Sequence, residues 1–346
     1  MRYQGLDFLR GIAIIGVLFR HMEIDSWLAR PGGYGVDLFF VLSGFLVSGL
    51  LFSEYLRNGH IYPGRFLIRR GFKIYPSFYF FIIATIAIYA VFYNSYFPTS
   101  FILSEIFFLQ SYLTPIWLHT WSLAVEEHFY ILLVMILSLC FRFNWIQDKA
   151  KMIFLFTVII FITMALRFYY VQNVFSKDHE AFFYTHLRMD GLFTGALLGY
   201  LWHFKKNLIK SFYKRKKVYA SLIPFLVLPA FILSTDNTFM LTIGFNLFHI
   251  ACALAILLLL EGERNIISQG KGIGGKLISG ISLVGIYSYS IYLWHVPVQN
   301  ILIRYVPDRL LESVLYIIIS LVVGIGMSRM IEKPMLNLRD KYFPRK

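Results

Sequence analysis

The chain has 346 residues, of which 58% are hydrophobic and only 15% carry charge, whereas a soluble domain averages about 25% charged residues. Its formal net charge at pH 7 is +14, and the positive residues gather in short clusters between apolar stretches, as in 65–73 and 205–217. This placement is typical of the cytoplasmic loops of multi-spanning membrane proteins and argues against nucleic-acid binding.

Apolar stretches of about 17–22 residues recur along the whole chain, and this is the length that a helix needs to cross the bilayer core. They predict an all-α, polytopic membrane protein with about ten transmembrane helices. In chain order, the predicted spans are 6–24, 36–56, 74–93, 121–141, 152–171, 188–204, 218–234, 239–260, 280–300 and 313–331. No linker or repeat divides them, so 1–346 is predicted to be a single transmembrane domain without an appended soluble domain.

The apolar segment 101–117 is broken by prolines, with Pro98 just before it and Pro115 within it. Because proline breaks helices, we interpret this segment as a re-entrant or interfacial piece and not as a further span. With ten spans, both termini lie on one side, and most of the 33 lysines and arginines fall in the segments of that side. The bias predicts that the N- and C-termini are cytoplasmic.

The first predicted span contains Asp7, Arg10 and His21. A charge inside a span costs several kcal/mol unless it faces a partner or a wet cavity, so each such residue is a candidate for a functional site. Arg10 and His21 share one helix face and lie about 16 Å apart along the axis, with Arg10 near the inner leaflet and His21 near the outer one. The alternative for His21 is an interfacial histidine that points toward water.

Asp37 opens the second span among apolar residues, where an acid needs a partner. The inner loop that follows carries Arg65, Arg69, Arg70 and Lys73 within nine residues. This cluster is either a topology signal or an anion site in which Arg69, Arg70 and Lys73 converge on phosphates.

The fourth span begins near the adjacent carboxylates Glu126 and Glu127, which we expect at the outer face at the depth of His21. The alternative is that they cap the helix N-terminus, which the helix dipole favours. In the sixth span Arg188 and Asp190 are expected to pair with each other or to cap the helix.

The ninth span brings Trp294 and His295 to the outer face, beside the level of His21. The pattern of charges is thus two-sided, with cations at the inner leaflet and acids and histidines toward the outer one. An enzyme with a phosphorylated cytoplasmic donor and an external acceptor could use both groups. A proton channel has no use for the inner cations.

Seven motifs occur in one order along nearly the whole chain. They are LDFLRG at 6–11 with His21 after it, FFVLSGF at 39–45, RRGFKIYP at 69–76, WSLAVEEHFY at 121–130, THLRMDGLFTGALLG at 185–199, SYSIYLWH at 288–295 and IEKP at 331–334. In these motifs the chain resembles the membrane-bound acyltransferase-3 family, whose members O-acylate glycans and cell-envelope polymers.

The resemblance implies that His21 is the catalytic histidine and that Arg10, Arg70 and Lys73 serve the acyl donor. The family usually has arginine at the position of Lys73, and glutamine at the position of His128. The implied donor is acetyl-CoA, with no metal, and the implied location is the plasma (inner) membrane as a multi-pass protein.

The expected mechanism follows from this resemblance together with the two-sided pattern. Arg69, Arg70 and Lys73, with Arg10, would hold the phosphates of acyl-CoA. His21 would act as general base on an acceptor hydroxyl, oriented by Glu126 or Glu127, with a covalent acyl-histidine as the alternative. The expected acceptor-binding residues are Asp37, Trp121, Trp294 and His295.

The expected partners are acyl-CoA, a glycan or lipid-linked glycan acceptor, and membrane lipid, with no nucleic acid. The function from another class is a transporter or flippase of glycan or lipid intermediates. Such transporters are commonly built from internal repeats, and the sequence shows none. A non-catalytic membrane scaffold is disfavoured by the number of ionisable residues inside spans.

Overall fold

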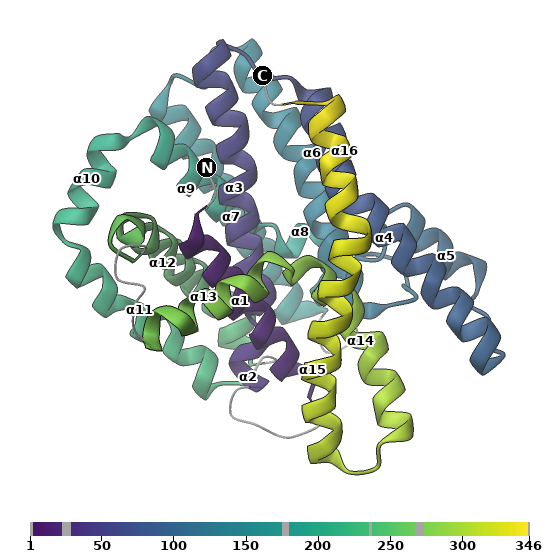
Figure 1. The fold of residues 1–346 in the computed structure, drawn as a ribbon. Helices are drawn as coiled ribbons and strands as arrows, with labels where there is room; N and C mark the ends of the chain where they lie inside the picture. The colour runs from purple at the N-terminus through teal and green to yellow at the C-terminus, as the bar shows by residue number, and fades with distance from the viewer. Residues whose placement is uncertain (1–2, 23–28, 175–179, 235–236, 267–272, 345–346) are drawn as a thin grey trace.

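The computed structural model describes residues 3–22, 29–174, 180–234, 237–266 and 273–344, and these residues form helices and connecting turns with no strand. The longer helices are α1 (Gln4–Arg20), α3 (Gly35–Asn58), α4 (Pro63–Tyr93), α6 (Trp121–Arg142), α7 (Lys149–Asn173), α9 (Asp190–Phe204), α11 (Lys216–Ile232), α12 (Phe245–Ile266), α13 (Ile273–Ile286), α14 (Ser288–Tyr305) and α15 (Arg309–Met327). The prediction of an all-α, polytopic membrane protein is confirmed (Figure 1).

Shorter helices connect and extend the long ones. They are α2 (Ala29–Gly32), α5 (Thr99–Ile106), η1 (Leu118–Thr120), η2 (Glu180–Phe183), α8 (Thr185–Arg188), α10 (Lys206–Lys214), η3 (Met240–Gly244), η4 (Ser328–Glu332) and α16 (Lys333–Tyr342). The segments η3 and η4 are π-helical turns that run directly into α12 and α16.

Six helical stretches of the described chain are long and apolar enough to cross a membrane, or seven if the bent pair α13–α14 is one span. Three other predicted spans fall on α1, α9 and α11, which have 17, 15 and 17 residues. The membrane-spanning character is therefore confirmed, and the total of ten spans stays a prediction.

The predicted ninth span, 280–300, is not one continuous helix. It is divided between α13 and α14, whose axes differ by 74°. Gly11 and Gly285 allow α13 to pack closely on α1 before this bend, because a Cβ at either position would collide with the backbone of the partner helix. The end of α13 is thus held against α1, and the chain turns away from it into α14.

The segment 101–117 begins inside the eight-residue helix α5 and continues in turns. Eight helical residues extend about 12 Å, which is too short to cross a bilayer core of about 30 Å. The interpretation of this segment as a piece that does not span the membrane agrees with the structure. In Figure 1 α5 lies at the far end of the arm formed by α4.

Helix α3 lies at the centre of the bundle and packs closely on α9. A Cβ on Gly44 would collide with the carbonyl of Leu192, and a Cβ on Gly195 with that of Val41. Small residues at such positions let helix backbones approach closely in a membrane, where packing replaces the hydrophobic effect as the attraction.

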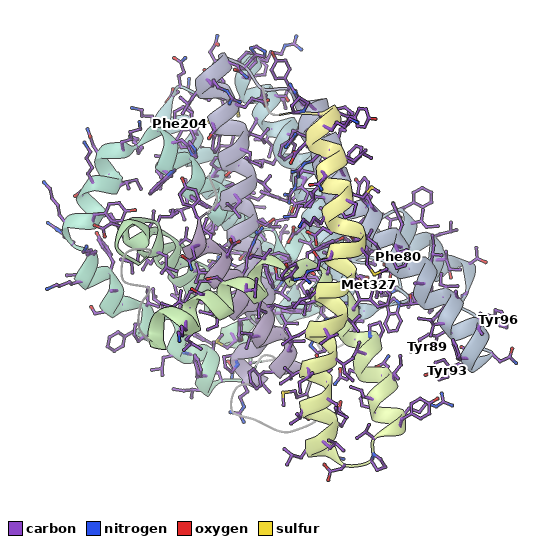
Figure 2. The ribbon with its side chains drawn as sticks, in the orientation of Figure 1. Phe80, Tyr89, Tyr93, Tyr96, Phe204 and Met327 are labelled. Carbon is purple, nitrogen blue, oxygen red and sulfur yellow. The ribbon has the colours of Figure 1, made fainter. Side chains whose placement is uncertain are left out.

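Large apolar side chains cover the outside of the helices, as Figure 2 shows along the arm that carries Phe80, Tyr89, Tyr93 and Tyr96. Phe80 is 41% exposed and Tyr96 is 76% exposed. In a membrane protein such surfaces face lipid, so this exposure is expected.

Both chain termini lie toward the same end of the bundle in Figure 1, with α1 running away from that end and α16 returning to it. Helix α2 lies at the opposite end. This arrangement is the one that the topology prediction requires. The assignment of the terminal end to the cytoplasm stays a prediction.

Candidate functional site

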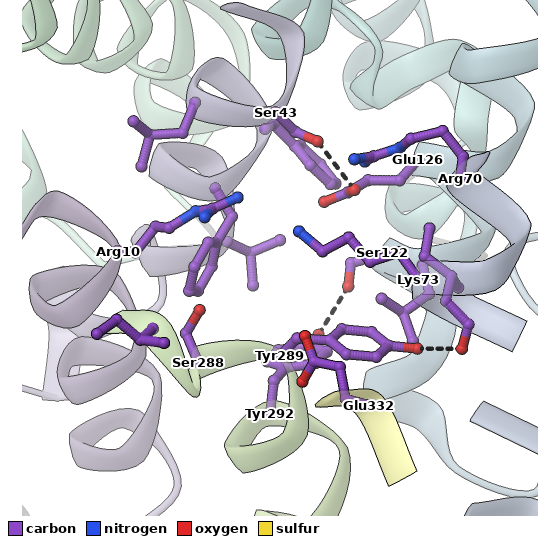
Figure 3. A pocket seen from close by; sticks show the side chains of 17 residues that line it. Arg10, Ser43, Arg70, Lys73, Ser122, Glu126, Ser288, Tyr289, Tyr292 and Glu332 are labelled. Carbon is purple, nitrogen blue, oxygen red and sulfur yellow. Dashed lines mark hydrogen bonds between the residues drawn. The ribbon is translucent and has the colours of Figure 1, made fainter. Parts of the chain in front are cut away.

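A cavity of about 90 Å³ lies inside the bundle where α1, α3, α4, α6, α14 and η4 meet (Figure 3). Its charged wall residues are Arg10 from α1, Arg70 and Lys73 from α4, Glu126 from α6 and Glu332 from η4. With three cations against two carboxylates, this cavity, here called the cation cavity, favours an anionic occupant.

Arg70 is held in the cation cavity by Tyr130. Its guanidinium lies over the tyrosine ring at 4.3 Å from the centroid and donates a hydrogen bond to the tyrosine hydroxyl. The same hydroxyl donates to Glu126, which also accepts from Ser43 at 3.0 Å. Arg70 is thus linked to Glu126 through one tyrosine, a fixed arrangement of donors in a low-dielectric site.

Arg69 lies outside the cation cavity, so the expected convergence of three cations from this loop is wrong for one of them. Arg69 and Arg70 point about 100° apart on α4, so Arg70 can face the cavity while Arg69 faces α16. Arg69 instead pairs with Asp340 at 2.8 Å and donates to the carbonyl of Phe343.

Glu332 and the hydroxyls around it were not predicted as site residues. Glu332 accepts hydrogen bonds from Ser290 at 3.0 Å and Ser328 at 2.8 Å, which fix it at the edge of the cavity. Tyr289, also in the wall, donates to the carbonyl of Ile74 at 2.9 Å. The sequence signal for these residues was their place in the motifs at 288–295 and 331–334.

A second cavity, of about 530 Å³, adjoins the first and is here called the histidine cavity. Its wall residues include His21, His119, Tyr34, Trp121, Phe182, Phe183, Phe245, Arg20, Arg188 and Asp37. Aromatic rings with a few polar groups are the usual lining of a site for a small organic or sugar group.

His21 directly follows α1 as its C-cap residue and presents one ring nitrogen as a base. Its Nδ1 lies 2.9 Å from the carbonyl of Val17. Because a carbonyl can only accept a hydrogen bond, we assign the proton of the neutral ring to Nδ1. The other nitrogen, Nε2, then carries the lone pair that can accept a proton.

Three histidine rings form one cluster beside this cavity. The His295 ring lies edge-on to His21, with centroids 4.8 Å apart, and to His119, with centroids 5.0 Å apart. His295 Nδ1 is 2.6 Å from the carbonyl of Tyr292. The expectation that His295 reaches the level of His21 therefore agrees with the structure, whereas His119 was missed although it stands two residues before Trp121.

Neither Glu126 nor Glu127 contacts His21, which corrects the expectation that one of them orients the catalytic ring. Glu126 belongs to the cation cavity, and Glu127 accepts from Tyr75 at 3.0 Å. Along α6, each residue advances 1.5 Å, so Glu126 lies about 8 Å deeper than Trp121 at the helix start. In the described part of the chain the ring of His21 hydrogen-bonds to the backbone of Val17 and to no carboxylate.

Asp37 lies in a buried ion network at the rear of the histidine cavity. It accepts from Arg188 at 2.9 and 3.0 Å and lies 3.1 Å from Nε2 of His249. Asp190 pairs instead with Arg167 at 2.7 Å. The expected pairing of Arg188 with Asp190 is therefore wrong, and the role of Asp37 in acceptor binding stays a prediction.

The two predicted tryptophans have different places. Trp121 lines the histidine cavity, with its ring 5.9 Å from that of Phe40. Trp294 lines neither cavity and packs on Phe81 of α4, with ring centroids 5.3 Å apart. Successive residues of α14 point in different directions, so His295 contacts His21 while Trp294 turns to α4.

Two residues, Val36 and Tyr292, line both cavities. The cation cavity and the histidine cavity therefore meet at this pair. One cavity favours an anionic occupant, and the other places a base among aromatic side chains. This arrangement is suited to group transfer from a charged donor to an uncharged hydroxyl.

The chain matches the family described as an acyltransferase domain (acyltransferase-3) over residues 3–329. A protein of Staphylococcus aureus strain MRSA252 named "Putative O-acetyltransferase" is 30% identical over 381 residues, covering 99% of this chain and 60% of that protein. O-acetyltransferase OatA of Staphylococcus aureus strain NCTC 8325 is 27% identical over 365 residues, covering 98% of this chain and 58% of that protein. The chain thus spans about three fifths of the length of these curated relatives, and no solved structure matches it.

Proposed function

The chain belongs to the acyltransferase-3 family of acyltransferase domains, and from this premise we propose that it is a membrane O-acetyltransferase. It moves an acetyl group from acetyl-CoA on the cytoplasmic side to a hydroxyl of a cell-envelope or extracellular glycan, such as an exopolysaccharide, a capsule or a lipid-linked intermediate. The protein works in the plasma membrane, where donor and acceptor are on opposite sides.

The observation that carries this proposal is the contact between the two cavities. Arg10, Arg70 and Lys73 supply the positive charge that an anionic donor requires. The cation cavity, at about 90 Å³, admits only a slender part of CoA, so the adenosine stays outside it. His21 stands in the adjoining cavity, whose aromatic walls suit a sugar ring.

In the proposed reaction, Nε2 of His21 takes the proton of the acceptor hydroxyl while its oxygen attacks the thioester carbonyl carbon. The new C–O bond forms, the C–S bond breaks, and the proton passes from His21 to the sulfur to give the free thiol of CoA. The Val17 carbonyl accepts the hydrogen bond from Nδ1–H and stabilises the charged ring. It takes the role that was expected of Glu126 or Glu127. The alternative in which Nε2 itself attacks the thioester gives a transient acetyl-histidine.

Inverted membrane vesicles from cells with and without the gene test the proposal. The vesicles receive acetyl-CoA with a ¹³C-labelled acetyl group, and esters of the envelope glycans are released with mild alkali and measured by mass spectrometry. We expect labelled acetate from the wild-type vesicles only. Glycan changes that need the gene but not acetyl-CoA would support a transporter and overturn the proposed transferase.

A further inference from the structure

The junction of the two cavities is formed by two side chains that line both of them. Val36 comes from the first turn of α3, and Tyr292 comes from α14. Phe40, one helical turn after Val36, lies edge-on to Trp121 with ring centroids 5.9 Å apart. Val36 and Tyr292 line both cavities, so a group that lies at the boundary between them lies beside these two side chains.

Both walls of the junction are held in place. The hydroxyl of Tyr292 lies 2.7 Å from the hydroxyl of Ser122 and donates to the carbonyl of His119 at 2.6 Å. On the other side, a Cβ on Gly35 would collide with the carbonyl of Ala13, so the start of α3 lies directly against α1. A close-packed wall of this kind responds to a change of one methylene group.

The reaction requires the acyl group to lie at this junction. Its carbonyl carbon must meet the oxygen that His21 deprotonates, while the thioester sulfur remains joined to the part of CoA held by the cations. The acyl chain beyond the carbonyl then extends from the same point and has to fit beside Val36.

We propose that Val36 and Tyr292 select the acyl group by its length and admit the two-carbon acetyl group in preference to longer ones. This assignment rests on the proposed function and adds to it the residues that select the acyl group of the donor. One methylene in a fixed apolar pocket changes specificity by roughly 10- to 200-fold.

A competition between two donors tests the assignment. Inverted vesicles that contain the full chain receive equimolar acetyl-CoA and propionyl-CoA, and the acetate and propionate released from the glycans by mild alkali are counted by mass spectrometry. We expect wild-type protein to favour acetate by at least about tenfold. Val36→Ala removes two methyl groups from the junction and should lower the acetate-to-propionate ratio about tenfold, whereas Val36→Leu should raise it.

Val298→Ala is the matched control, because this buried valine of α14 lines neither cavity. Its ratio should equal that of the wild type. A wild-type ratio near one would overturn the assignment, as would Val36 variants whose ratios stay unchanged or move in the same direction. If wild-type vesicles form neither acetate nor propionate ester on the glycans, the proposed function is overturned as well. If esters form but their ratio is the same in the wild type and the Val36 variants, only the role of the junction is overturned.

Discussion

Arg69 and Arg70 are neighbours in the chain, yet their guanidinium groups have different surroundings. Arg70 lines the cation cavity and rests on Tyr130, while Arg69 pairs with Asp340 near the end of α16. At the scale of single residues, the direction of a side chain on its helix decides whether a cation lines a binding cavity or forms an ion pair between two helices.

Arg70→Ala should therefore weaken acetyl-CoA binding, and Arg69→Ala should not. The loss of a charged hydrogen-bond donor costs about 1.5–3 kcal/mol, which corresponds to a dissociation constant raised about ten- to a hundredfold. Isothermal titration of the purified protein in detergent measures both variants. Equal weakening in the two variants would show that the cations act through their summed charge and not through the cavity.

His21→Ala should reduce acetyl transfer at least about a hundredfold, because general-base catalysis contributes about 10²–10⁴-fold. The substitution removes a ring at the end of α1 and should leave the amount of protein in the membrane unchanged. His60→Ala is the control, since His60 lies in the turn between α3 and α4 and lines neither cavity. Transfer of labelled acetate to glycan is the measurement, and full activity of His21→Ala would exclude the proposed base.

At the scale of elements, the break between α13 and α14 shapes the cation cavity. The chain turns by 74° at this point, and the first residues of α14, Ser288 and Tyr289, then line the cavity. A straight helix over 280–300 would continue along α1 and would not present these side chains. The close contact of Gly285 with α1 is thus a requirement of the site as well as of the fold.

Gly285→Ala should destabilise the protein by about 1–3 kcal/mol, because the added methyl group would collide with the carbonyl of Asp7. Gly280 lies on the same helix, and a Cβ there would meet nothing within 4 Å. Gly280→Ala should therefore leave stability unchanged or raise it slightly, by up to about 1 kcal/mol from helix propensity. Thermal unfolding in detergent compares the two alanines, and equal midpoints would contradict the close α1–α13 packing.

At the scale of the whole molecule, the charged side chains around the two cavities lie in separate clusters. The ion pairs Asp37–Arg188 and Arg167–Asp190 are almost completely buried and connect α3, α7, α8 and α9 behind the histidine cavity. Breaking a buried pair by removing one partner is strongly destabilising, so these two pairs hold the four helices together. The cation cavity lies on the other side of the junction, toward the end of the bundle that carries both termini.

Cysteine labelling tests the predicted orientation of the two ends. Arg30 in α2 and Arg57 at the end of α3 are exposed and lie at opposite ends of the bundle. A cysteine at Arg30 should react with a membrane-impermeant thiol reagent added to intact cells, and one at Arg57 only after the cells are opened. Wild-type protein, with Cys140 and Cys252 buried, gives the background. The reverse pattern would invert the topology and place His21 at the cytoplasmic face.

The sequence by itself determined the all-α membrane class, the family resemblance and the polar residues worth attention, because apolar length and charges inside spans are local properties of a chain in a bilayer. It also predicted that Arg10 and His21 lie at different depths of one helix, since helix rise depends only on residue number. Only the tertiary structure decided which side chains meet. Glu126 lies with Arg70 and not with His21, Trp294 packs on α4, and His119 joins the histidine cluster. These contacts depend on the rotation and tilt of helices against one another, which are set by packing between segments distant in the chain and leave no mark in the spacing along any one of them.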